Sequence, residues 1–374
     1  MELNRWRWRG SVALLAVAVG FVIYPLVEGE NDVINSDWPA FATGARLIVE
    51  SPSHLYDFEV QRRVELEVTG GRSLVTVGIH GILPFLAPAW VALIAVPFAV
   101  FGTNVGGRLW ILFGLACLGF GLHLAVRPLP PARWLPAFAS VPTALMLLNA
   151  QLDGLVALGI GAAIALWSKP YYAGLALGLT LVKPQLVVPL GLALLLARLW
   201  RVLAGYAVAA ALLWASTAAL NPRWVLDWLA SAGTTVQPAA REVDLPHLGI
   251  LVPAGYQLLA GGVLALAAFV LVLKLAQRRR DDFHAAAAVL IAGGVLAALH
   301  ALPADLVLVA VALAVWGKAT WYDWVVLSVG SAVCAVTPAP TPAIVGVLLI
   351  GWVCFRAGGV IPEWRRGPAQ TSAG

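Results

Sequence analysis

The chain has 374 residues, of which 61% are hydrophobic and only 11% are charged. Soluble domains carry about 25% charged residues, and a soluble fold of this length could not bury so much apolar surface. The composition therefore excludes a soluble globular protein and predicts an all-α polytopic membrane protein, because apolar runs of about 15–25 residues are typical of membrane helices and long alternating stretches are absent.

The net charge of +5 is concentrated in basic clusters that flank apolar segments. This placement is typical of cytoplasmic anchors, so we expect membrane lipids and no nucleic acid as partners. The three cysteines are isolated in apolar runs, which predicts neither a zinc site nor a disulfide framework. The clusters lie at residues 5–9, 198–201, 278–280 and 365–366.

The first predicted span covers residues 11–28 and is retained, because no small-residue cleavage site follows it. Arginines precede this span, which orients it from the cytoplasm outward and makes residues 29–75 the first extracytoplasmic loop. Pro39 suits the first turn of one helix in this loop, and a second helix is predicted at 58–68, with Glu65 on its polar side. We expect these two short amphipathic helices to lie on the bilayer surface.

The remaining apolar segments predict a single membrane domain over residues 1–360, followed by a cytoplasmic tail at 361–374. A second extracytoplasmic loop is predicted at 221–250. All segments together add up to an odd number of crossings, whereas two basic termini on the same side of the membrane require an even number. About twelve crossings are therefore expected, and the segment that is wrongly counted as a crossing lies between residues 72 and 170. The segments lie near 82–102, 107–126, 134–148, 152–167, 171–182, 184–198, 203–220, 252–275, 284–300, 303–316, 321–336 and 342–356.

Two polar breaks in these segments contain candidate binding residues. An ionisable residue within a span costs about 2.5–3.5 kcal/mol on insertion scales, so Lys183, which precedes Pro184, calls for an explanation. A lysine at a broken helix can bind a phosphate, although a short external turn would also bring it to water. Asn149 and Gln151 interrupt another segment, where their amides could hold sugar hydroxyls or form an ordinary turn.

The third break and the first loop supply the other candidates. His300 could orient a phosphate or a sugar, and Asp305 could fix the tautomer of that histidine. Asp37 and Asp57 are carboxylates of the first loop. Asp37 could act as a general base next to the bilayer, or it could cap the helix that begins after it. Asp57 could likewise cap the second helix.

Several of these segments resemble the GT87 family of membrane-embedded glycosyltransferases, which belong to the GT-C class and use polyprenyl-phosphate-mannose. The resemblance implies a GT-C-like fold in which Asp37 is the catalytic base, and Lys183 and His300 contact the donor phosphate. It adds Asn149, Gln151, Arg46, Asp57 and Asp305 as candidate sugar or acceptor contacts. Relatives often carry glycine where this chain has Ala150. The matching segments are 36–40, 44–47, 55–57, 149–151, 173–178, 183–185 and 300–305.

The implied function is inverting transfer of a sugar from a polyprenyl-phosphate donor to a glycolipid or polysaccharide acceptor. Mannose is the expected sugar, with arabinofuranose next, and the expected location is the outer face of the plasma membrane. The resemblance implies no nucleotide sugar, cofactor or metal. A transporter or lipid flippase would explain broken helices equally well, and a non-catalytic assembly subunit is a further alternative.

Overall fold

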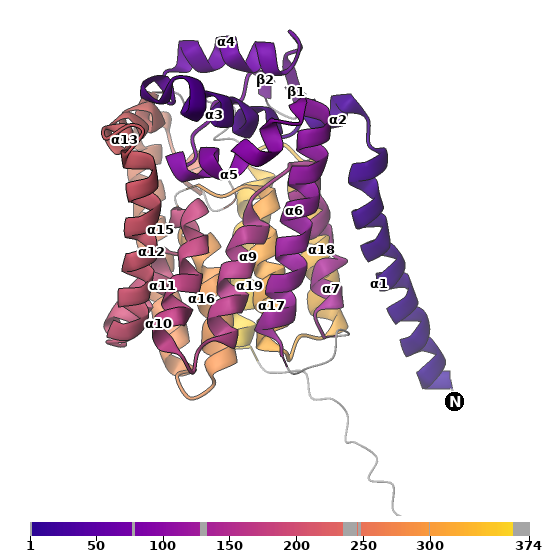
Figure 1. Ribbon diagram of the computed structural model, residues 1–374. Coiled ribbons are helices and arrows are strands. Elements are labelled where there is room, and N and C mark those ends of the chain that lie inside the picture. Colours follow the sequence, from indigo (N-terminus) through magenta and orange to yellow (C-terminus); the bar gives the residue numbers. More distant parts are fainter. Residues whose placement is uncertain are drawn as a thin grey trace, which may run out of the picture.

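The computed structural model describes residues 2–76, 79–127, 133–234, 245, 248–298 and 300–361. These residues form a bundle of roughly parallel helices that is covered at one end by shorter helices lying across it (Figure 1). Helix α1 (Glu2–Val27) stands at the edge of the bundle, with its N-terminus at the opposite end. The cytoplasmic tail predicted at 361–374 lies outside the described residues, except for Ile361.

Residues 30–99 form the covering layer, which we call the cap. Tyr56 OH donates to Ala87 O at 2.9 Å, and Gln61 Nε2 donates to Leu55 O and Phe85 O. Hydrogen bonds thus join separate segments in the middle of the cap. The two strands are antiparallel, with Val75 opposite His80. The elements are α2 (Glu30–Ile34), α3 (Trp38–Glu50), the 3₁₀ turn η1 (Pro52–His54), α4 (Phe58–Val68), β1 (Leu74–Thr76), β2 (Ile79–Gly81) and α5 (Ala89–Ala99).

The two predicted loop helices form close to the expected bounds, but the prediction that both lie on the bilayer surface is wrong for α3. Almost every residue of α3 from Trp38 to Ile48 is buried, because α3 packs against α4, α5 and α6 (Gly102–Ala125). Figure 1 shows α4 lying over α3, away from the bundle. The hydrophobic pattern identified the helix correctly, but it could not indicate that Thr43, on the polar face, would be fully buried.

Helix α5 contains only 11 residues of the predicted span 82–102. At about 1.5 Å per residue it is roughly 16 Å long, about half the thickness of a bilayer core. The segment before α5 is hydrogen-bonded to α4, since Phe85 N donates to Gln61 Oε1 at 2.9 Å and Leu83 N donates to Glu65 Oε1 at 2.9 Å. The segment 82–102 is therefore part of the cap.

Four described helices are long and apolar enough to cross a membrane, judged by length and composition: Gly10–Val27, Gly102–Ala125, Trp200–Ala218 and Leu259–Arg278. Shorter apolar helices complete the bundle. Its other elements are α7 (Leu135–Phe138), α8 (Val141–Leu148), α9 (Asp153–Ala165), α10 (Pro170–Leu177), α11 (Val188–Leu196), α12 (Trp200–Ala218), α13 (Trp224–Thr234), η5 (Leu248–Leu251), η6 (Ala254–Tyr256), α15 (Gln257–Arg278), α16 (Phe283–Ala297), α17 (Leu306–Trp316), α18 (Trp321–Val336) and α19 (Thr341–Ala357).

Glycines let helices α10 and α12 approach until their backbones touch. A Cβ atom at Gly174 would lie 1.9 Å from Val202 O, and one at Gly205 would lie 2.0 Å from Tyr171 O. No side chain fits at either position, so this pair of helices is held at the short separation that small residues allow in membranes.

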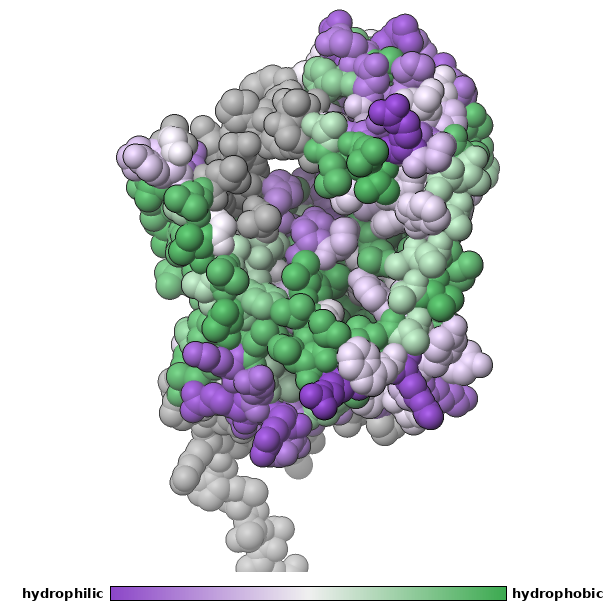
Figure 2. All heavy atoms as spheres, turned by 90° about the vertical axis from the view of Figure 1, so that its left-hand side faces the viewer, coloured by the Kyte–Doolittle hydropathy of each residue, from purple (hydrophilic) through white to green (hydrophobic). Residues whose placement is uncertain are grey.

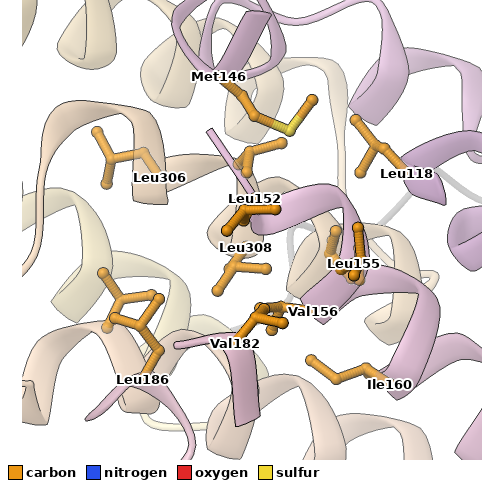
Figure 3. Close-up of a cluster of buried hydrophobic side chains, with 14 of the residues drawn as sticks. Leu118, Met146, Leu152, Leu155, Val156, Ile160, Val182, Leu186, Leu306 and Leu308 are labelled. Atoms are coloured by element: carbon orange, nitrogen blue, oxygen red, sulfur yellow. The ribbon is translucent and has the colours of Figure 1, made fainter. Parts of the chain in front are cut away.

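The helices stop at the polar breaks that the sequence indicates. After α10 the chain continues through the 3₁₀ turns η3 (Gly178–Val182) and η4 (Pro184–Leu186), and α17 is preceded by η7 (Pro303–Asp305). At each break, the polar residue is followed or preceded in the sequence by an apolar residue that is buried in the core. Figure 3 shows Leu152, Val182 and Leu306 among the buried side chains there, and all three are at most 3% exposed. The core therefore fixes the backbone of each break.

Contacts between distant segments distinguish the two ends of the bundle. At the end opposite the cap, Arg133 Nη1 donates to Gly317 O at 2.9 Å, and Lys318 pairs with Asp282 at 3.2 Å. At the cap end, Asn221 Nδ2 donates to Pro52 O at 3.2 Å and Trp228 Nε1 donates to Leu86 O at 2.7 Å. Between these ends, one side of the molecule presents a broad apolar surface (Figure 2).

Candidate functional site

Asp37 lies where the cap meets the bundle, at the residue before α3. Its side chain makes no capping hydrogen bond, and Trp38 N instead donates to Ser36 Oγ at 3.2 Å. The indole of Trp38 is fully buried and donates to Thr103 O at 2.8 Å, which fixes the start of α3 on α6. Helix capping, the structural alternative for Asp37, is therefore excluded, and its carboxylate is available for other contacts.

The turn at residues 149–151 holds Asp37 in place. Asp37 N donates to Asn149 O at 3.2 Å, and Gln151 Nε2 donates to Asp37 Oδ2. Trp110 Nε1 donates to Ala150 O at 2.9 Å. Ala150 has a φ of +51°, a left-handed conformation that glycine adopts more readily. This geometry explains why glycine suits the position, and it aims the amide of Gln151 at Asp37.

Lys183 is bound by two buried carboxylates. Its Nζ lies 2.9 Å from Asp153 Oδ2 and 2.5 Å from Asp305 Oδ1, and its side chain is 12% exposed. Asp305 Oδ2 also accepts from Leu302 N at 2.6 Å, which closes the turn at η7. The two carboxylates and one ammonium carry a net charge of −1 when all are ionised. Lys183 is therefore ion-paired within the protein, which the sequence did not indicate, and its role as a phosphate contact stays a prediction.

Asp153 completes this triad and was missed by the sequence analysis. It is fully buried, and its Oδ1 has no hydrogen-bond partner. Its position gave a usable signal, because an ionisable residue at the start of an apolar segment is rare and needs a partner. Sequence reasoning assigned the break to the amides of Asn149 and Gln151 and left the carboxylate unused.

The three breaks and the first loop meet at one place. The charges of Lys183, Asp305 and His300 all act on Asp37, and His300 is exposed. We call Asp37, Gln151, Asp153, Lys183, His300 and Asp305 the polar cluster. The side-chain amide of Asn149 belongs to its own helix end, because Nδ2 donates to Leu145 O at 2.8 Å.

Two expected contact residues have structural partners elsewhere. Arg46 pairs with Glu50 at 3.0 Å and with Glu67 at 2.9 Å, which joins α3 to α4 on the outer side of the cap. Asp57 caps α4, since Oδ1 accepts from Glu59 N at 3.0 Å and Val60 N at 3.2 Å. Neither is among the groups that act on Asp37, so the structure does not bring them into the polar cluster.

Glu65 is a second residue that the sequence analysis placed wrongly. It was assigned to the polar side of α4, but it is only 2% exposed and faces the cap interior. Its Oε1 accepts from Leu83 N at 2.9 Å, while Oε2 has no partner. Burial, assisted by the charge of Asp37, raises the pKa of Glu65 to about 8, and the hydrogen bond from Leu83 N opposes this shift.

The environment of Asp37 shifts its pKa towards neutral pH. Burial raises the pKa of Asp37 to about 7, and Asp305 acts in the same direction. Lys183, His300 and the hydrogen bond from Gln151 oppose this shift in pKa. A carboxyl group that titrates near neutral pH can accept a proton from a hydroxyl and later release it. Among the described residues, no group of three or more His, Cys, Asp or Glu is arranged to hold a metal ion.

Comparison with known proteins gives a family for this site. The profile of Glycosyltransferase family 87 matches residues 85–303, which is more than half of the chain. The matched part contains Gln151, Asp153, Lys183 and His300, whereas Asp37 precedes it and Asp305 follows it. Neither the curated proteins nor the solved structures contain a match. With its apolar helices and this match, the chain is a membrane protein that belongs to glycosyltransferase family 87.

Proposed function

We propose that the protein transfers a sugar from a polyprenyl-phosphate donor to a glycolipid or polysaccharide acceptor, with inversion at the anomeric carbon. The observation that supports this most is the carboxylate of Asp37. It is free of capping contacts, held by Gln151, and subject to the charges of Lys183 and His300. Such an arrangement puts a base and cations beside one another, as transfer from a phosphate-linked sugar requires.

In the proposed reaction Asp37 removes the proton from an acceptor hydroxyl while that oxygen attacks the anomeric carbon of the donor. The bond from this carbon to the phosphate oxygen breaks, and polyprenyl phosphate leaves with the bonding electrons. Lys183 has three N–H donors, of which two meet Asp153 and Asp305. The third, together with His300, would stabilise the charge that develops on the leaving phosphate.

The shape and hydropathy of the surface support binding of a lipid-linked donor that approaches from within the bilayer. Figure 2 shows that the apolar side of the molecule is hollowed in its upper part, and that hydrophilic residues lie inside the hollow. A polyprenyl chain would lie against the apolar surface while its phosphate enters the recess. Burial of the chain would contribute to affinity in proportion to its apolar area.

We propose about twelve crossings, with the polar cluster on the extracytoplasmic side of the plasma membrane. Placing α5 in the cap removes one predicted span and makes the number even. Arg127 and Arg133 then fall on the same side as Lys318, as the contact between Arg133 and Gly317 requires. This arrangement follows the rule that basic residues are enriched in cytoplasmic loops.

Mannose is the proposed donor sugar, with arabinofuranose as the next candidate. The test is transfer by purified protein from polyprenyl-phosphate-mannose to a panel of glycolipid acceptors, with the anomeric configuration of the product determined by NMR. Asp37→Asn should lower the turnover rate roughly 10²–10⁴-fold, the range for loss of a general base. Lys183→Arg, which keeps the charge, should raise the KM for the donor.

A transporter or flippase predicts a different result in the same preparation. It would move the lipid across vesicle membranes without forming a glycosidic bond, and Asp37→Asn would have no effect on sugar transfer because none would occur. Retention of configuration in the product, or full activity of Asp37→Asn, would overturn the proposed mechanism.

A further inference from the structure

Gln151 has a direct contact with Asp37 that the proposed chemistry leaves unexplained. Its Nε2 donates to Asp37 Oδ2, and the residue is only 6% exposed. The amide is therefore shielded from solvent and has a defined acceptor. The amide nitrogen has two N–H donors, and one of them is occupied by the carboxylate of Asp37 before any substrate arrives.

The backbone around Gln151 fixes the direction of this hydrogen bond. Ala150 holds the left-handed conformation, Trp110 Nε1 donates to Ala150 O at 2.9 Å, and Asp37 N donates to Asn149 O at 3.2 Å. The next residue, Leu152, is 2% exposed and enters the core shown in Figure 3. Both ends of the turn are thus anchored by contacts with other parts of the chain.

We propose that Gln151 is a positioning residue that holds one oxygen of Asp37, so that the other oxygen faces the acceptor hydroxyl as the ionised base. This inference rests on the proposed function. A carboxylate has two equivalent oxygens, and without an anchor it can rotate about its terminal bond. One fixed N–H donor to Oδ2 sets the plane of the group and leaves Oδ1 for the proton.

The same hydrogen bond favours the ionised form of Asp37. The groups that act on this carboxylate are Lys183, His300 and Asp305 from the bundle, and Glu65, from the cap, interacts with it as well. Burial and Asp305 raise the pKa of Asp37, while Lys183, Gln151 and His300 lower it. Among these, Gln151 is the one uncharged side chain, so it can be replaced without changing the net charge.

The test compares pH profiles of kcat/KM for three variants with the wild type. Gln151→Leu should move the acid limb to higher pH by about one unit, because a hydrogen bond to a charged group is worth about 1.5 kcal/mol or more. Gln151→Glu should move it further, because a second carboxylate would repel the first. Gln257→Leu is the matched control, since that amide donates to Val252 O at 3.4 Å and should leave the profile unchanged.

The order of the variants separates positioning from packing. Glutamate has nearly the shape of glutamine, so a purely structural role would be restored by Gln151→Glu and lost in Gln151→Leu. The proposal requires the reverse order for the shift of the acid limb. An acid limb at the wild-type pH in Gln151→Leu, or a normal profile in Gln151→Glu, would overturn it.

A second measurement does not depend on the identity of the substrates. The ionisation of Asp37 can be followed by infrared difference spectroscopy of the purified protein, with Asp37→Asn used to assign the carboxyl band. The midpoint should rise by about one pH unit in Gln151→Leu and stay constant in Gln257→Leu. If the wild type transfers no sugar but the midpoint shifts as expected, the proposed function fails and the contact stands. An unshifted midpoint contradicts the Gln151 proposal in either case.

Discussion

Two buried ionic centres lie at opposite ends of the bundle and differ in how completely they are satisfied. At the end away from the cap, Asp323 and Arg356 are each 1% exposed and pair through two contacts of 3.2 Å. Asp323 also accepts from Thr320 N at 2.7 Å and Trp352 Nε1 at 3.2 Å. One positive and one negative charge balance, and both carboxylate oxygens are hydrogen-bonded.

The triad of Asp153, Lys183 and Asp305 has neither property. Two carboxylates share one ammonium, and Asp153 Oδ1 has no partner. Buried polar groups are almost always satisfied, so an exception marks a place where structure serves another purpose. The pair joins α18 to α19, whereas the triad leaves one carboxylate oxygen unpartnered and a net negative charge that acts on Asp37 in part through Asp305.

The largest expected effect comes from breaking the balanced pair. Arg356→Met should lower the free energy of unfolding by about 3–5 kcal/mol, because it leaves Asp323 charged, buried and without its partner. Chemical unfolding in detergent micelles measures this change. The double variant with Asp323→Asn should recover most of the loss. If Arg356→Met were as stable as the wild type, the pair would have no structural role.

The next effect concerns Asp37 and depends on pH. An unfolded aspartate has a pKa of about 3.9, and burial raises the pKa of Asp37 to about 7. Between these values the folded protein holds a proton that the unfolded chain has released, so the contribution of Asp37 to stability falls as pH rises. Asp37→Asn should thus be more stable than the wild type above pH 7, by up to about 4 kcal/mol, with no difference below about pH 4.

Unfolding of both proteins across this range of pH provides the check. The gap in stability should open between about pH 4 and 7 and remain constant at higher pH. A gap that is already present at low pH would mean that asparagine stabilises the fold by packing and not by removing a buried charge.

The smallest effect is expected at the unbalanced triad. Asp153→Asn leaves Lys183 and Asp305 as a balanced pair, and it removes one buried charge of the kind that is costly without full pairing. The free energy of unfolding should change by less than about 1 kcal/mol, compared with about 3 kcal/mol or more for Asp323→Asn. Equal losses in the two variants would show that the triad is as structural as the pair.

The sequence predicted the helices and polar breaks well, because both depend on local patterns. Asp37, Lys183 and His300 were recognisable as polar residues at the ends or interruptions of apolar segments, and the family resemblance is confirmed by the match over residues 85–303. The bounds of α4 agree with the predicted helix at 58–68. The roles of these residues in catalysis stay predictions.

Errors arose where a contact joins distant parts of the chain. Glu65 was grouped with the polar residues of α4 because no local pattern reveals that Leu83 N would bind it. Asp153 was overlooked because its ion-pair partner, Lys183, lies 30 residues away in the sequence. The segment 82–102 was counted as a span because its composition is apolar, and only the contacts with α3 and α4 show that it belongs to the cap.

The anchoring of Trp38 has a consequence for how such an enzyme could diversify. Its indole is bound to Thr103 O at the start of α6, and its ring lies against Gly107, where a Cβ atom would come within 2.8 Å. The position of Asp37 is therefore fixed by contacts of the neighbouring Trp38 with α6 of the bundle, although Asp37 precedes a helix of the cap. Substitutions on the outer side of the cap, such as in α4, should therefore leave Asp37, the proposed base, in place. Changes in the outer cap helices could then alter which acceptor is bound, while the polar cluster stays the same.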